Sequence, residues 1–538
     1  MRLEEDSRQI WRDNLRLNRR ELVRSAAATA LLGPTAAIAA KPVTKIPHKI
    51  PSVFGISDNR FDDLRRGANA RWLGNDQSRI TVPLSNSDAK DAVSFAVDRG
   101  LRLAARSGGH CYESFATEGI ELSVNMREFK SVGFDQEFGA ISVGAGCTLG
   151  ETYGALFRRW GVTVPGGTCP TVGLGGHVPG GGYGALSRMH GLIIDHLAGA
   201  EILLVDRDSN IRQTVALRRD HGSSRDLWWA LTGGGAGQIG LITRFLFATS
   251  DGQRTPADIL PRAPENVIQS SVRWNWDDLS SSAFKRVVRA YGDWLEAHSG
   301  NSPSARSLFS QLRLQPRTAG SFEMMTQIDP DVPGAESSLA AFEQHVIQDT
   351  TAVRSARKLP WLMATIDTIA FSISDTTRRF KGKSAYLRKG FTDEQLDTLY
   401  EQLGSSNIKN PAFVAMLTSY GGKINEIHPT ETATWQRNSI IKINFIVFWD
   451  NASEDNEHIS NMRKLYSSLF STSGGVPVHN EAAEGCYIGY ADEDLQSKEW
   501  NKSGFTYKDL YWGGNARVLT ELRTRYDPHN IFMHAQVS

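Results

Sequence analysis

Gly167-Thr-Cys169-Pro-Thr-Val-Gly-Leu-Gly-Gly-His177 is a glycine-rich loop with a single thiol, and Arg106-Ser-Gly-Gly-His110 ends an apolar run with a single imidazole. His110 lies 59 residues before Cys169. Glycines let backbone approach a ligand closely and leave N–H groups free to face phosphate. We therefore interpret the two segments as a site that holds a phosphorylated cofactor and bonds to it covalently through His110 and Cys169.

The residues before His110 predict a β-α-β unit. A strand is expected at 79–84. Ser87 can cap a following helix that ends at Gly100, and the apolar residues recur at helical spacing: Ala89, Ala92, Val93, Ala96 and Val97. Residues 101–106 are then a buried strand that leads into the first glycine-rich segment. Ligands of α/β sheets bind at such strand ends.

The rest of the chain alternates predicted strands and helices. A helical stretch begins at Asp226, and the stretch 250–265, rich in Pro, Asp and Arg, is a candidate domain boundary. Residues 307–314 and 322–328 predict a β-hairpin. Further short strands are expected at 120–124, 140–143 and 201–205.

Residues 440–449 form the clearest predicted strand of the second half. Lys442 and Asn444 fall on one face with Ile446 and Phe448, whereas the other face is wholly apolar: Ile441, Ile443, Phe445, Val447 and Trp449. Two polar groups on such a face line a substrate cavity or lie at an edge that faces solvent. The pattern is compatible with either.

Length and composition indicate a globular chain of two or more domains. The 538 residues exceed one ordinary core, and 40% hydrophobic with 22% charged residues is neither a disordered nor a membrane-spanning composition. The net charge of +1 shows no basic excess for nucleic acid. The cysteines have no metal-ligand spacing, and one disulfide remains open among Cys111, Cys147, Cys169 and Cys486.

The first 40 residues have the features of a twin-arginine export signal. Arg19-Arg20 precedes an uncharged, alanine-rich stretch at 25–40, and Ala37-Ile-Ala39 offers a small-residue cleavage site. The apolar stretch is too short for a stable membrane span. We expect an exported protein, periplasmic or secreted, with an ordinary amphipathic helix as the alternative.

Several motifs occur in an order that one family shares: Arg106 to His110, Cys169 to Gly184, Tyr420-Gly-Gly-Lys-Ile-Asn-Glu-Ile427, Tyr487-Ile-Gly-Tyr490 and Tyr511-Trp-Gly-Gly-Asn515. The chain resembles the berberine bridge enzyme-like FAD-linked oxidases, which have the vanillyl-alcohol oxidase fold. The first two segments resemble the histidyl-flavin and cysteinyl-flavin loops of that family. The others resemble its substrate-domain signature and its C-terminal region.

The resemblance implies an α+β fold. A PCMH-type FAD-binding domain of two α/β subdomains would accompany a substrate domain, whose antiparallel sheet is covered by helices and roofs the flavin ring. The implied division is a signal peptide at 1–40, a lead-in at 41–75, the FAD-binding domain at 75–255, the substrate-binding domain at 256–480, and a C-terminal segment at 481–538 that returns to the FAD domain.

The resemblance also implies an FAD bonded twice, by an 8α-histidyl bond to His110 and a 6-S-cysteinyl bond to Cys169. His177 and His190 lack the second attachment pattern, and we expect them to order loops. Val172 is at the position where the family sets oxygen access, and its size resembles the oxygen-reactive members, so we predict an oxidase that makes hydrogen peroxide. The remaining residues expected at the cofactor are Arg106, Ser107, Gly108, Gly109, Gly173, Gly175, Gly176, Gly180 and Asn515.

The implied reaction is the two-electron oxidation of an alcohol, in which a base takes the hydroxyl proton and hydride passes to flavin N5. Tyr490 is the first choice for the base or its partner. Its ordinary pKa near 10 must be lowered to act near neutrality, and Lys442 could supply the positive charge. Tyr487 is a close competitor, and Tyr183 and Tyr112 also fall at positions of family active-site tyrosines.

Asn444 departs from the family pattern. Some members have glutamate there and use it as the base, and others have glutamine. Asparagine cannot accept a proton at neutral pH, so we expect Asn444 to position the substrate by hydrogen bonding. This favours tyrosine-based alcohol oxidation over a carboxylate-driven ring closure.

The expected partners are O2 and a small alcohol, sugar or natural product, with no nucleic acid and no stable membrane insertion. Substrate identity and oligomeric state stay open. The main alternative is a dehydrogenase of the same fold with a quinone or protein acceptor, and a non-catalytic binding protein is the second. The glycines do not form G-x-G-x-x-G followed by an acidic residue after a strand, which argues against a nicotinamide enzyme.

Overall fold

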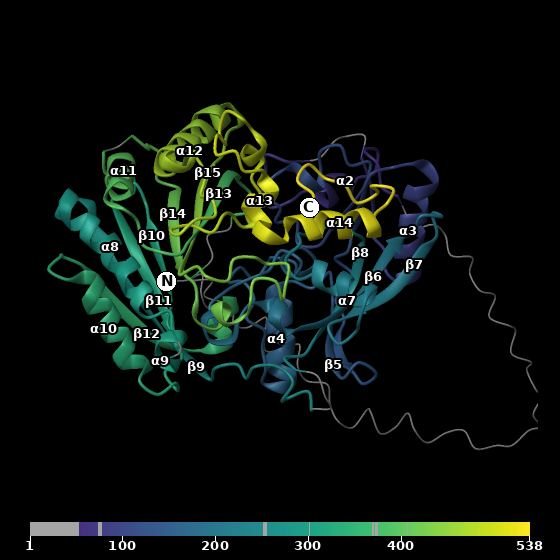
Figure 1. The fold of residues 1–538 in the computed structure, drawn as a ribbon, viewed down its shortest axis with the longest axis horizontal. Coiled ribbons are helices and arrows are strands. Elements are labelled where there is room, and N and C mark those ends of the chain that lie inside the picture. The colour runs from purple at the N-terminus through teal and green to yellow at the C-terminus, as the bar shows by residue number, and fades with distance from the viewer. Residues whose placement is uncertain are drawn as a thin grey trace, which may run out of the picture. The chain divides into compact units, whose positions relative to one another are not determined.

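Three β-sheets organise the described part of the chain (Figure 1). The computed structural model describes residues 53–73, 78–250, 255–300, 302–367, 371, 375–405 and 407–538, all within the unit Lys49–Ser538. The predicted export signal and its cleavage site lie outside the described residues. None of the helices in the described ranges has the length and apolar character that a membrane crossing requires.

The first sheet is small and parallel, and it leads into the His110 loop. Both outer strands run parallel to the central one in the order β1-β3-β2: β1 Arg79–Thr81, β2 Leu103–Arg106 and β3 Leu122–Asn125. Helix α3 (Asn86–Arg99) joins β1 to β2 and ends at Gly100, whose φ is 62°. The predicted β-α-β unit is therefore confirmed. The predicted cap Ser87 is wrong, because the hydroxyl that accepts from the Asp88 N–H belongs to Ser85.

The second sheet is antiparallel and has the order β4-β5-β8-β6-β7: β4 Val132–Asp135, β5 Ala140–Gly144, β6 Leu197–Val205, β7 Ile211–Leu217 and β8 Leu241–Phe247. The long connection from β5 to β6 contains the Cys169 loop and three helices: α4 Leu149–Trp160, α5 Leu174–His177 and α6 Ser187–His190. Helix α7 (Ser223–Ala230) begins three residues before the predicted start at Asp226.

The third sheet is antiparallel and has the order β12-β9-β11-β10-β14-β15-β13. Its strands are β9 Asn266–Asn275, β10 Phe309–Leu314, β11 Ser321–Ile328, β12 Val353–Pro360, β13 Arg379–Leu387, β14 Phe413–Ser419 and β15 Ile441–Trp449. The predicted hairpin of β10 and β11 is confirmed. β15 lies between β14 and β13, and Lys442 and Asn444 are buried, so their face of the strand is interior and not a solvent edge.

Helices cover one face of this third sheet, as Figure 1 shows for the helices at its outer side: α8 Ser281–Ala297, α10 Ala335–Ile347, α11 Asp393–Gly404 and α12 Asp455–Leu469. Tyr291 of α8 donates its hydroxyl to the carbonyls of Ser310 and Leu417 at 3.0 Å, which joins helix to sheet. The short helix α9 (Pro303–Ser307) precedes β10. The opposite face of the sheet contributes side chains to the cavity described below.

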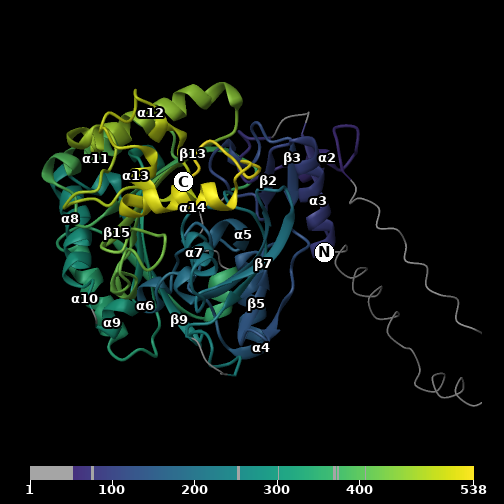
Figure 2. The ribbon, with the colours of Figure 1, turned by 45° about the vertical axis from the view of Figure 1, so that its right-hand side comes forward.

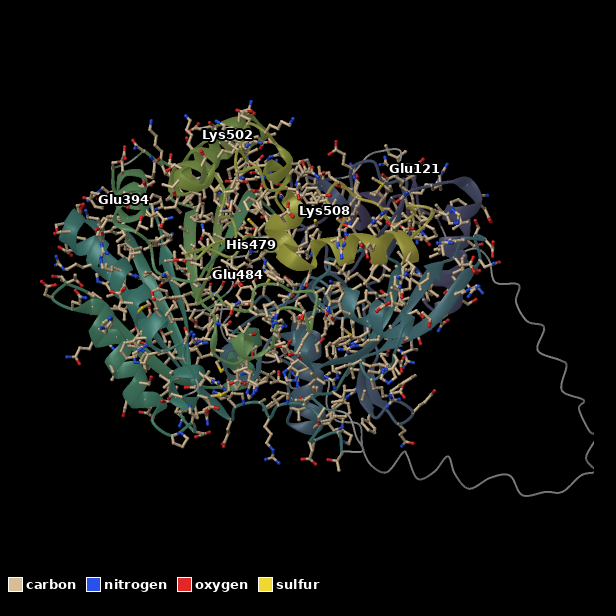
Figure 3. All side chains as sticks on the ribbon, viewed as in Figure 1. Glu121, Glu394, His479, Glu484, Lys502 and Lys508 are labelled. Carbon is tan, nitrogen blue, oxygen red and sulfur yellow. The ribbon has the colours of Figure 1, made fainter. Side chains whose placement is uncertain are left out.

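The chain after α12 runs along the open edge of β13. The N–H of Arg388 donates to the Ala482 carbonyl at 2.8 Å. The side chain of Glu484, which is labelled in Figure 3, is buried and accepts from the Ser439 hydroxyl at 2.7 Å. Helices α13 (Tyr507–Trp512) and α14 (Ala516–Tyr526) then lie between the third sheet and the first (Figure 2). The Leu103 N–H of β2 donates to the Ile531 carbonyl at 3.0 Å, so the last residues contact the strand that leads to His110.

Candidate active site

A cavity of about 300 Å³ lies between the two glycine-rich loops and the inner face of the third sheet. Its walls come from segments that are far apart in the sequence: the loops after β2 and β5, strands β10, β13, β14 and β15, and the segments around 236–238 and 487–491. The lining contains all the predicted site residues except Lys442 and Asn515.

The two glycine-rich loops touch each other backbone to backbone. A Cβ added to Gly108 would lie 2.3 Å from the Gly173 nitrogen, and one added to Gly173 would lie 2.2 Å from the Gly108 nitrogen. The Ser107 hydroxyl donates to the Ala145 carbonyl at 2.7 Å, and the Gly175 N–H donates to the same carbonyl at 3.0 Å. Only glycine allows this approach, which brings the two reactive side chains to one wall of the cavity.

One hydroxyl connects His110 and Cys169. Thr171 Oγ1 lies 3.0 Å from His110 Nε2 and 3.3 Å from Cys169 Sγ, and Cys169 is a free thiol. Burial, helped by the charge of Arg127, lowers the pKa of His110 to about 4. The imidazole is therefore neutral at physiological pH and keeps a lone pair for bond formation. Sequence reasoning missed Thr171, although a hydroxyl two residues after the cysteine was a local signal.

His177 orders the cysteine loop, as expected. Its Nε2 accepts the Gly167 N–H at 2.9 Å, and burial together with the charge of Lys442 lowers its pKa to about 3. For His190, the ordering contact is made by the backbone, because its carbonyl is 2.9 Å from His196 Nε2. The Arg106 side chain is turned toward helix α2 (Phe61–Arg65), where it donates to the Leu64 carbonyl at 2.5 Å.

Four predicted tyrosines meet at the cavity. The Tyr183 and Tyr490 hydroxyl oxygens are 2.9 Å apart. Tyr112 stacks on Tyr490 with ring centres 4.8 Å apart and 17° between planes, whereas Tyr487 stands nearly perpendicular to Tyr490 at 5.0 Å. The glycine loops supply Tyr112 and Tyr183, and the C-terminal segment supplies Tyr487 and Tyr490.

Lys442 lies against the rings of this cluster and not at their hydroxyls. Its Nζ is 3.0 Å from the ring centre of Tyr487 and 3.3 Å from that of Tyr183, and it has no hydrogen-bond partner among the described residues. Burial holds the pKa of Lys442 well below its usual value and that of Tyr490 well above its own. The pKa of Tyr490 is thus raised, whereas the sequence-based expectation was that it is lowered. Desolvation disfavours both the ammonium of Lys442 and the phenolate of Tyr490.

Asn444 presents an unused acceptor to the cavity. Its Nδ2 donates to the Tyr112 hydroxyl at 3.0 Å, whereas its Oδ1 is buried without a partner in the described part of the chain. Buried polar atoms in native proteins almost always have partners. A ligand hydroxyl in the cavity would supply the missing donor.

Sequence reasoning missed much of the wall that faces the loops. Gly382 of β13 allows the Tyr112 ring to lie against the strand, because an added Cβ would be 2.4 Å from Tyr112 Cε2. Phe115 and His534 stack at 4.8 Å on another part of the wall. The wall on the third sheet is largely apolar, and Gln311 and Asn444 are its polar residues. Its apolar side chains are Phe309, Phe380, Met416, Ile446 and Phe448, and Phe371 lines the cavity with them.

Asn515 does not reach the cavity, which corrects its assignment to the cofactor. Its buried side-chain amide donates to three backbone carbonyls, those of Pro429, Thr432 and Ala433, at 2.8–3.3 Å. These bonds hold the start of α14 against the 429–433 loop. The amide is therefore committed to the fold.

The residues present fit a flavin dinucleotide. Among the described residues, the N–H groups of Gly108, Gly109 and His110 have no hydrogen-bond partner, so they are free for phosphate. A Cβ on Gly176 or Gly237 would meet nothing within 4 Å, which shows open space where these glycines line the cavity. A neutral imidazole and a free thiol on one wall are the nucleophiles that two covalent bonds to the cofactor require.

The comparisons with known proteins agree with this site. A family model described as an FAD binding domain matches residues 78–212. A second family model, described as "Berberine and berberine like", matches residues 486–537. Aclacinomycin-N/aclacinomycin-A oxidase of Streptomyces galilaeus is 39% identical over 487 residues, covering 89% of this chain and 88% of that protein.

Solved structures show the same fold. The crystal structure of CrmK, a flavoenzyme of caerulomycin biosynthesis, has a TM-score of 0.86 at 36% identity and covers 90% of this chain and 98% of its own. The glycopeptide hexose oxidase DBV29, solved with teicoplanin, has a TM-score of 0.86 at 35% identity, and the match covers 91% of this chain and 99% of that protein. The chain therefore belongs to the berberine bridge enzyme-like FAD-linked oxidases, and it is an FAD-linked oxidase that acts on alcohols.

Proposed function

We propose that the protein holds FAD through two covalent bonds, to His110 and Cys169, and oxidises a sugar or natural-product hydroxyl with O2 as the final acceptor. The observation that carries the proposal is the Thr171 hydroxyl bridge between the imidazole and the thiol, on the cavity wall that leads to the tyrosine cluster. Two bonds would hold the cofactor without enclosing it, which leaves room for a bulky substrate.

The proposed reaction converts R2CHOH and O2 into R2C=O and H2O2. Bound FAD supplies the acceptor for the hydride, and reduction of O2 restores it. The protein supplies orientation and proton transfer. The unpartnered Asn444 Oδ1 accepts a hydrogen bond from a substrate hydroxyl other than the one that reacts, and thereby orients the substrate.

Tyr490 is the proposed base, and Tyr183 is its partner. As a phenolate, Tyr490 accepts the substrate hydroxyl proton, and the Tyr183 hydroxyl at 2.9 Å donates to that phenolate and stabilises it. The Lys442 side chain lies over the rings of Tyr183 and Tyr490 and packs against this pair. Tyr487, whose ring lies closest to Lys442, remains the alternative base.

The substrate is proposed to carry its hydroxyl on a large apolar body. The wall of the third sheet offers aromatic and aliphatic side chains over most of its area, with Gln311 and Asn444 as polar groups. A free oligosaccharide would need more hydrogen-bonding groups than this wall presents. The names of aclacinomycin oxidase and of the teicoplanin-bound hexose oxidase point to glycosylated natural products.

The test is a substrate panel with peroxide detection. Purified holoprotein is mixed in air with aclacinomycin A, teicoplanin, cellotriose and benzyl alcohol, and both peroxide and the oxidised product are measured. We expect peroxide in equal amount to product and a preference for a glycosylated, apolar substrate. Product formed without peroxide, only when a quinone is added, would assign the protein to the dehydrogenases.

A further inference from the structure

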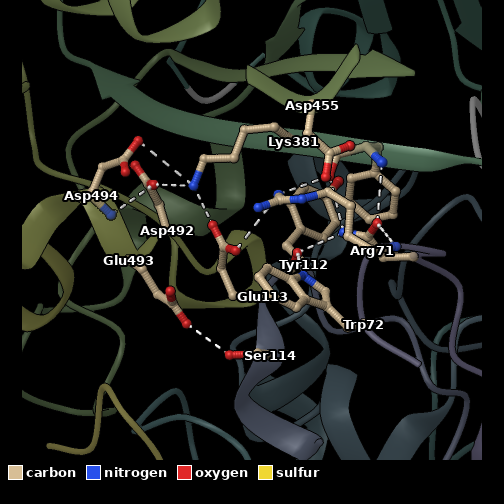
Figure 4. Close-up of polar contacts among 12 residues, drawn as sticks. Arg71, Trp72, Tyr112, Glu113, Ser114, Lys381, Asp455, Asp492, Glu493 and Asp494 are labelled. Atoms are coloured by element: carbon tan, nitrogen blue, oxygen red, sulfur yellow. Dashed lines mark hydrogen bonds and ion pairs between the residues drawn. The ribbon is translucent and has the colours of Figure 1, made fainter. Parts of the chain in front are cut away.

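A cluster of buried charges lies beside the tyrosine wall of the cavity (Figure 4). Lys381 Nζ donates to Asp492 Oδ1 at 2.8 Å and also contacts the Glu113 carboxylate. Lys383 Nζ lies 2.7 Å from both Asp492 Oδ2 and Asp494 Oδ2. All five side chains are at most 4% exposed.

This ion cluster joins three segments that build the site. Glu113 directly follows Tyr112, and Asp492 comes two residues after Tyr490. The two lysines lie on β13 on either side of Gly382, the residue against which the Tyr112 ring packs. The loop after His110, the edge of the substrate sheet and the C-terminal segment are thus connected through buried ion pairs.

None of the five charged residues lines the cavity. Tyr112 and Tyr490 belong to different segments, and their rings stack at 4.8 Å, so their relative position depends on what ties those segments together. Ion pairs that bridge the neighbouring backbone provide that tie. A second link runs from the Tyr112 carbonyl, which accepts from Asn69 at 2.9 Å and from Trp72 at 3.1 Å.

We propose that Glu113, Lys381, Lys383, Asp492 and Asp494 form an ion cluster that positions the Tyr112–Tyr490 stack for proton transfer from the substrate. They are positioning residues, and the inference rests on the proposed function of Tyr490. Buried ion pairs are a poor means of gaining stability, because the desolvation of both charges offsets their attraction. A cluster of this kind at the junction of the three segments instead fixes one geometry.

The test uses two buried glutamates of similar exposure. Glu113→Gln keeps the shape of the side chain and removes its charge. Glu343→Gln is the matched control, because Glu343 is equally buried at 3% and pairs with Ser270 and Arg354 away from the cavity. Lys381→Met and Lys381→Arg form a second pair, in which arginine restores the charge.

For each holoprotein the measurements are the melting temperature, the crystal structure, and anaerobic flavin reduction by the panel member that reduces the wild type fastest. We expect both glutamine variants to lower the melting temperature. Only Glu113→Gln should slow reduction at saturating substrate, by about 10- to 100-fold, with little change in the substrate dissociation constant, because a displacement of about 1 Å can cost that much in rate. Lys381→Arg should recover more of the rate than Lys381→Met.

Equal reduction rates for Glu113→Gln and Glu343→Gln would overturn the proposal and leave the cluster a structural feature. If no panel member reduces the wild-type flavin, the proposed function is what has failed. The crystal structures then still decide the positioning claim: an unchanged Tyr112–Tyr490 stack in Glu113→Gln contradicts it, and a displaced stack supports it. If Lys381→Met does not fold, the comparison of Glu113→Gln with Glu343→Gln decides the proposal by itself.

Discussion

Gly382→Ala is the substitution whose effect the geometry determines most sharply. Gly382 lies on β13, and its Cα faces the ring of Tyr112. A Cβ at this position would be 2.4 Å from Tyr112 Cε2 and 2.5 Å from Cδ2. Carbon atoms in contact are ordinarily about 3.5–4.0 Å apart, so the ring or the strand must move by about 1 Å.

Such a movement affects the site more than the fold. The Tyr112 hydroxyl accepts from Asn444 Nδ2 at 3.0 Å, and a shift of about 1 Å would break this bond and change the stack on Tyr490. Overpacking of this kind costs about 1–3 kcal/mol of stability. The loss in rate should be larger, about 100-fold, because reactions depend steeply on the placement of catalytic groups.

The assay compares Gly382→Ala with Gly133→Ala as holoproteins. Gly133 also lies in a strand, β4, but a Cβ there would meet nothing within 4 Å. We expect full flavin content in both variants, a lower melting temperature and a much lower kcat in Gly382→Ala, and near wild-type behaviour in Gly133→Ala. Wild-type kcat in Gly382→Ala would refute the placement of Tyr112 in the site.

Three other outcomes are expected. Because a base acts when deprotonated and burial raises the pKa of Tyr490, kcat/KM should rise with pH through the neutral and alkaline range, and a Tyr490→Phe variant that keeps this rise would exclude Tyr490 as the base. Val172→Leu should slow reoxidation of the reduced protein by air in stopped-flow experiments, and unchanged reoxidation would contradict the oxidase assignment. The pKa of His177 is about 3 in the fold and about 6.5 when unfolded, so the neutral imidazole stabilises the fold above pH 6.5 and this contribution is lost as pH falls toward 3. The free energy of unfolding, measured with urea, should therefore fall less steeply with decreasing pH in His177→Gln than in the wild type between pH 6 and 4, by up to about 1.4 kcal/mol per pH unit.

Local patterns predicted much of the fold. The β-α-β unit, the end of α3 at Gly100, the β10–β11 hairpin and the buried strand β15 all depend on residue spacing within about twenty positions. The cap of α3 was misassigned because two serines lie near the helix start. The cap is the one whose hydroxyl meets the N–H three residues on, and that is Ser85.

The site was predictable only where a motif encodes it. His110, Cys169 and the tyrosines stand in such motifs, whereas Gly382 matters because of Tyr112, which is 270 positions earlier in the chain. No local period signals a contact at that separation. The pKa directions of Lys442 and Tyr490 also depend on burial, which the sequence alone does not show.

Covalent attachment of the flavin is tested most directly by intact mass of acid-denatured protein. We expect the wild-type chain to be heavier by one FAD and yellow after denaturation. His110→Ala and Cys169→Ala should each retain the flavin through the remaining bond, and the double variant should lose it. A colourless wild-type pellet with free FAD in the supernatant would contradict covalent attachment through His110 and Cys169.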